Sequence, residues 1–64
     1  MNDRLKQEER VKLADAVRNE CLREALEAYE YASQKGLCHE GAWEYAIDAL
    51  RNLKVEELLV QIYK

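Results

Sequence analysis

The sequence contains no proline and only two glycines, Gly36 and Gly41, so few positions interrupt long stretches of regular backbone. Proline and glycine are the residues least compatible with the interior of a helix. Ten glutamates and eight alanines favour helix further, whereas six Val and Ile residues and the absence of threonine give β-strands no support. We therefore predict an all-α chain.

Gly36 divides this helical chain. The segment Lys35-Gly36-Leu37 is typical of a helix C-terminus, in which glycine takes the left-handed conformation and an apolar residue follows it. We predict a first helix over about residues 3–35, with residues 1–8 open to fraying, and a second over residues 39–52. Residues 55–63 form either a third helix or the continuation of a bent second one, since residues 52–54 allow a short break.

The length of 64 residues predicts a single domain over residues 1–64, with a core that is marginal without a disulfide, a metal or a partner chain. Such a chain is too small to enclose a catalytic pocket of the usual ~300 Å³ or more. With one serine, no threonine and one histidine, a nucleophile and base could come only from Cys38 and His39. Neighbouring residues diverge by about 100° on a helix, so we expect no enzyme and no cofactor.

Charge is distributed unevenly along the chain. Residues 1–18 carry a net charge of +1, residues 19–48 of −5 and residues 49–64 of +1. Nucleic-acid binding needs clustered lysine and arginine, and this pattern argues against it. The charged N-terminal segment lacks the apolar stretch of a signal peptide, and no run approaches the ~18 apolar residues of a membrane span. We expect a soluble cytoplasmic protein without nucleic-acid or membrane partners.

Apolar residues recur at helical spacing and define the faces expected to be buried. The first helix carries a stripe of small residues with large residues at its edges, and a second stripe matches it. The predicted central stripe of the first helix is Ala14, Cys21, Ala25, Ala28 and Ala32, flanked by Val11, Val17, Leu22, Leu26 and Tyr29; that of the second is His39, Trp43, Ala46, Ile47, Leu50 and Leu53.

Helix lengths then suggest an architecture. A first helix of about 45 Å cannot be covered by residues 39–52, which span about 20 Å. We predict an antiparallel helical hairpin with a long first helix and a bent or broken second arm; a compact three-helix bundle is the alternative. Several apolar residues lie off the stripes, and a second copy could cover them in a four-helix bundle-like dimer. These residues are Leu13, Leu26, Leu59, Val60 and Tyr63.

A short sequence pattern that occurs twice suggests a surface for a protein partner. Residues 28–32 and 42–46 both read Ala-aromatic-Glu-Tyr-Ala. In a hairpin, Tyr29 and Trp43 would meet on the inner face, leaving Tyr31 and Tyr45 outside among acidic residues. Because aromatics are enriched in interface cores, we interpret these residues as a candidate interaction surface for a protein partner. The surface comprises Tyr31, Tyr45, Glu27, Glu30 and Glu44.

The two cysteines give an alternative function. Cys21 lies about 22 Å along the first helix from the turn that carries Cys38, too far for a disulfide, so both are predicted to be free thiols. Cys38, His39 and Glu40 stand together at a helix start, where the helix dipole favours a thiolate and Glu40 opposes it. A zinc site usually needs four ligands, which this segment lacks. Cys38 and His39 are nevertheless the candidate reactive or metal-ligating residues, with a redox or sensing role.

The pattern as a whole favours a small protein-interaction or regulatory module that self-associates, most simply as a homodimer. We take this as the expected function, with the thiol or metal site as its alternative.

Overall fold

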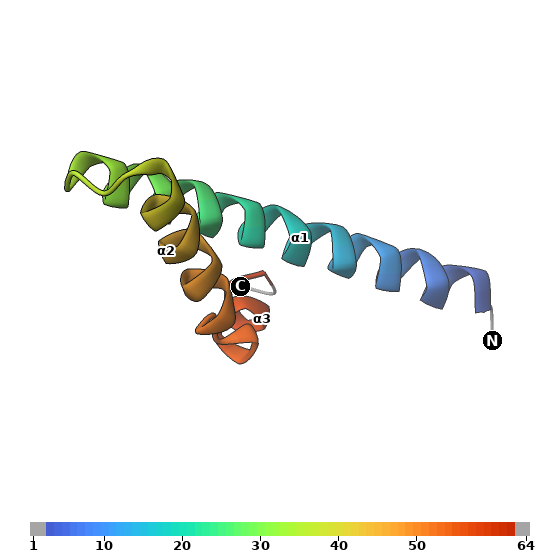
Figure 1. The fold of residues 1–64 in the computed structure, drawn as a ribbon. Helices are drawn as coiled ribbons and strands as arrows, with labels where there is room; N and C mark the ends of the chain where they lie inside the picture. Colours follow the sequence, from blue (N-terminus) through green and yellow to red (C-terminus); the bar gives the residue numbers. More distant parts are fainter. Residues whose placement is uncertain (1–2, 63–64) are drawn as a thin grey trace.

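The protein is built from three helices (Figure 1). The computed structural model describes residues 3–62, in which α1 spans Asp3–Gln34, α2 spans His39–Arg51 and α3 spans Val55–Ile62, with no strand among them. The prediction of an all-α chain is confirmed, and a break over residues 52–54 makes α3 a separate helix. Asn2, a possible start for the first helix, and Tyr63 lie outside the described residues.

The turn after α1 is a Schellman motif. Gly36 has φ of +91°, a left-handed conformation that other residues adopt only with strain. The Leu37 N–H donates to the carbonyl of Ala32 and the Gly36 N–H to that of Ser33, so the last carbonyls of the helix are satisfied. Two residues later α2 begins.

Alanines make the contact between α1 and α2. Ala32, Ala42 and Ala46 are 1%, 0% and 3% exposed, and Leu58 of α3 is the one large apolar side chain buried among those described. Because alanine has no side chain beyond Cβ, the two helices can approach closely at this point. Residues with large side chains are consequently displaced to either side of the contact.

This arrangement corrects part of the predicted inner face of α1. Ala14 is exposed, whereas Leu13 is half-buried and lines a hollow with Ile62 of α3. Glu20 and Glu24 are also half-buried. The reason is that α3 approaches the side of α1 that carries Leu13.

The N-terminal part of α1 projects beyond the other two helices (Figure 1). Residues 6–12, which we call the overhang, are all exposed. The molecule is consequently elongated, with dimensions of 54 × 19 × 15 Å and a radius of gyration of 15.3 Å. A compact chain of this length would have a radius of gyration of about 11 Å.

The two glycines provide a matched pair of substitutions. We predict that Gly36→Ala destabilises the protein by about 1–2 kcal/mol, because an L-residue is strained at this φ although no atom lies within 4 Å of the new methyl group. Gly41→Ala should stabilise α2 by up to about 1 kcal/mol, since its methyl group would lie 3.5 Å from Leu37 Cδ2, an ordinary contact. Urea unfolding followed by circular dichroism at one protein concentration measures both. Equal effects of the two substitutions would contradict the assigned turn.

Candidate functional site

An apolar groove runs between α1 and α2 on one side of the molecule. It has a volume of about 460 Å³, and its edges are formed by Leu22, Leu26 and Trp43, which are 56%, 63% and 58% exposed. Such large apolar side chains gathered on one surface are typical of a binding site. We call this set the apolar groove; its lining is completed by Ala25, Tyr29, His39, Ala46, Ile47 and Leu50.

Tyr29 and His39 close the end of the groove next to the turn. The Tyr29 hydroxyl and His39 Nδ1 are hydrogen-bonded at 2.5 Å, and the two rings meet edge to face with centroids 5.7 Å apart. Trp43, predicted to meet Tyr29 on the inner face, lines the same groove but is 58% exposed, so its predicted inner position is wrong. The alanines occupy the helix contact itself, so Trp43 lies at the groove edge rather than in the core. The hydrogen bond ties α1 to the first residue of α2.

Tyr31 and Tyr45 lie together on the other side of the α1–α2 contact. Their ring centroids are 5.7 Å apart, and Lys35 Nζ stands 5.4 Å from the centre of the Tyr31 ring. The two rings are 50% and 44% exposed, and Glu27 lines the same shallow hollow. Three of the five residues of the candidate interaction surface are thus brought together.

The other two residues of that surface lie apart from the tyrosine pair. Glu44 lines a different hollow, together with His39, Glu40 and Trp43. Glu30 is exposed on α1 and lines none of the hollows described here. We therefore use the name tyrosine surface for Tyr31, Tyr45 and Glu27 only.

The Cys38 thiol has a structural partner. Cys38 is the N-cap of α2, and its Sγ accepts a hydrogen bond from the Gly41 N–H at 3.5 Å. Sulfur here takes the place of the oxygen that serine or aspartate usually supplies. Cys38 and Cys21 are both free thiols, the first exposed and the second half-buried. Among the side chains of residues 6–62, no three from His, Cys, Asp or Glu come close enough to hold a metal ion.

Ion pairs form between neighbouring turns of α1. Arg23 pairs with Glu20 and Glu27, and the hydrogen bond and charge of Glu20, with a smaller contribution from Glu27, raise the pKa of Arg23 above its usual value. Arg18 pairs with Asp15 at 3.1 Å. These groups are exposed to solvent except for Glu20, which is half-buried, and water and salt weaken exposed ion pairs, so the pairs add little to stability.

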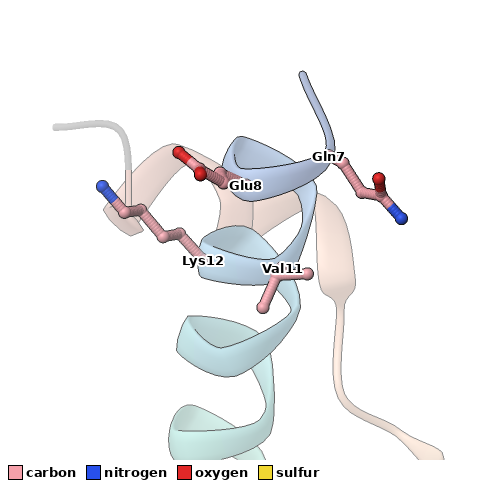
Figure 2. Close-up of a pocket in the computed structure, with 4 residues that line it drawn as sticks. All are labelled: Gln7, Glu8, Val11 and Lys12. Atoms are coloured by element: carbon pink, nitrogen blue, oxygen red, sulfur yellow. The ribbon is translucent and has the colours of Figure 1, made fainter. Parts of the chain in front are cut away.

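The overhang carries a second exposed apolar position. Val11 is 56% exposed and shares a shallow hollow with Gln7, Glu8 and Lys12 (Figure 2). Figure 2 shows Glu8 and Lys12 extending to one side of Val11 and Gln7 to the other. The valine side chain is thus left open between polar neighbours.

The helical pattern alone did not identify the groove. Leu26 was predicted to lie off the buried stripe, and its exposure agrees with this, as does that of Leu59 and Val60. Trp43, in contrast, was assigned to the central stripe of the second helix, and Leu22 was placed with Leu26 among the residues that flank the stripe of the first. The signal that could have found the groove is the run of alanines, because a contact made by small side chains leaves larger neighbours uncovered.

Comparison with family models, with curated proteins and with solved structures found no match to this chain. Over residues 3–62, none of the helices combines the length and apolar character that crossing a membrane requires.

The cap at Cys38 can be tested by two substitutions. Cys38→Ser should leave the free energy of unfolding unchanged or raise it, since a hydroxyl is a better acceptor than a thiol. Cys38→Ala removes the acceptor and should lower the free energy of unfolding by about 1 kcal/mol. Thermal unfolding monitored by circular dichroism measures both. An alanine variant as stable as the serine variant would show that the thiol does not cap α2.

Proposed function

We propose that this protein is a small, non-catalytic protein-interaction module. Its helical hairpin self-associates through the exposed apolar helix faces into a four-helix bundle-like dimer. The tyrosine surface stays available to a different protein partner.

The observation that carries this proposal is that the single chain exposes more surface than a compact monomer of the same mass. The chain exposes 5585 Å². A compact monomer of 7.5 kDa exposes about 4,200 Å², so the excess is about 1,400 Å². Each partner in a stable protein complex buries about 800 Å². One interface of ordinary size would therefore remove most of the excess.

The position of the exposed apolar residues supports the same conclusion. Leu22, Leu26 and Trp43 lie around one groove and not at scattered positions. Scattered apolar residues are normal on a protein surface, whereas a contiguous apolar patch marks an interface. The aromatic Trp43 is of the residue type most often found to dominate binding energy.

The tyrosine surface is suited to a different kind of contact. Its two rings are about half exposed, and Glu27 adds a negative charge beside them. The neighbouring Lys35 already places its ammonium group near the Tyr31 ring. A partner that presents basic and aromatic side chains fits this chemistry, because cations are attracted to both carboxylates and aromatic faces.

The alternative function, a thiol or metal site at Cys38 and His39, has less support. Each of the two side chains already has a hydrogen-bond partner, in Gly41 and Tyr29 respectively. Among the side chains that the structure describes, no group of three His, Cys, Asp or Glu residues that could hold a metal ion includes them.

Sedimentation equilibrium tests self-association directly. We expect a dimer at micromolar concentration, and we expect Leu26→Glu to raise its dissociation constant about tenfold or more, because it puts a charge into an apolar interface. Val55→Glu is the matched control, since Val55 is 51% exposed on α3 and outside the groove. A folded wild-type monomer at these concentrations would refute the proposal.

Affinity capture from extracts of the native host tests the tyrosine surface. Immobilised wild-type protein should retain a partner that the Tyr31→Ala, Tyr45→Ala double variant does not retain. Val60→Ala serves as the control and should retain it. Circular dichroism must show unchanged helix content. If capture is unchanged in the double variant, the tyrosine surface does not bind the partner.

A further inference from the structure

The apolar groove and the overhang are two uncovered parts of one helix face. Val11 and Leu22 are eleven residues apart, which is three helical turns, so they point to the same side of α1. Tyr29, eighteen residues from Val11, lies on that side after five turns. The groove residues Leu22, Leu26 and Trp43 are 56%, 63% and 58% exposed, and Val11, drawn in Figure 2, is 56% exposed.

We infer that two copies of the chain pair in antiparallel orientation, with the overhang of each copy, centred on Val11, docked in the apolar groove of the other. This inference rests on the proposed self-association and specifies its geometry. An isologous dimer requires that a surface be complementary to itself. When Val11 of one copy lies opposite Leu26 of the other, the two-fold axis of the dimer passes near Arg18. The same symmetry then places Leu26 of the first copy opposite Val11 of the second.

Charge selects the antiparallel orientation. Residues 1–18 have a net charge of +1 and residues 19–48 of −5. In a parallel pair the two acidic segments would lie side by side and repel one another. In the antiparallel pair each acidic segment lies beside the basic groups of the other copy's N-terminal segment, which include Lys6, Arg10 and Lys12.

Length also fits this pairing. α1 contains 32 residues and is therefore about 48 Å long, close to the 54 Å length of the whole molecule. Contacts from Val11 to Leu26 extend over about 22 Å on each copy, enough for a helix–helix seam of four turns. The seam would cover the exposed residues of the groove and Val11 together, which a contact confined to the groove would not do.

The tyrosine surface stays outside this seam. Tyr31 is two residues from Tyr29 and therefore lies about 200° from it around α1. The dimer can thus form on one side of the α1–α2 contact while another protein binds on the other side.

Distances between spin labels test the orientation. Gln34 and Asn19 are exposed, so each can be replaced singly by a labelled cysteine in a Cys21→Ala, Cys38→Ser background that sedimentation equilibrium shows to be dimeric. In the antiparallel dimer, labels at Gln34→Cys should be about 45–50 Å apart, whereas labels at Asn19→Cys should lie within about 20 Å. A parallel dimer would place both pairs within about 20 Å.

A substitution in the overhang tests its docking in the native sequence. Val11→Glu should raise the dimer dissociation constant about tenfold or more, because a carboxylate would enter the partner's apolar groove. Val55→Glu, the same change at an exposed position of α3, should leave the constant within about twofold of wild type. Val11 is 56% exposed and shares its hollow with exposed residues only, so helix content should be unchanged in circular dichroism.

The outcomes separate this inference from the proposed function. A dimer with short distances at both labelled positions, or a Val11→Glu variant that dimerises as tightly as wild type, would overturn the antiparallel docking and leave self-association standing. A monomeric wild-type protein would overturn both. Long Gln34 distances together with a weakened Val11→Glu dimer would support both.

Discussion

The close contact between α1 and α2 at alanine residues determines much of this molecule. Ala32, Ala42 and Ala46 bring the two backbones together, and the Schellman turn at Gly36 directs α2 into that position. Alanine side chains bury little apolar area, so this contact gives the chain close packing with only a small hydrophobic driving force. The larger apolar residues remain at the sides of the contact, where one chain alone cannot cover them.

The two sides of this contact differ in chemistry. One carries the apolar groove, with Leu22, Leu26 and Trp43 at its edges. The other carries Tyr31 and Tyr45 beside Glu27. A mainly apolar surface suits a permanent contact such as a dimer seam, whereas an acidic and aromatic surface suits a partner that binds and leaves. The proposed function uses both sides without competition between them.

Local features of this fold were predictable from sequence, and features that depend on the relation between helices were not. The lack of proline predicted the helices, and Gly36 followed by Leu37 predicted the end of the first one. The actual inner face of α1 depends on which side α3 approaches, and helical periodicity carries no information about that. For the same reason, Trp43 was expected at an inner contact and lies at the groove edge, and Glu44 lies apart from the tyrosine surface.

The single large buried residue of α3 has a consequence for the dynamics of the chain. Leu58 is the only buried residue of this eight-residue helix, with 5% of its surface exposed, and Ile62 adds a half-buried contact beside Leu13. Segments with few buried contacts open at a lower free energy than the rest of a protein. The backbone amides of α3 should therefore exchange their hydrogens with solvent through local opening. The amides of α1 and α2 next to the alanine contact should stay protected from exchange.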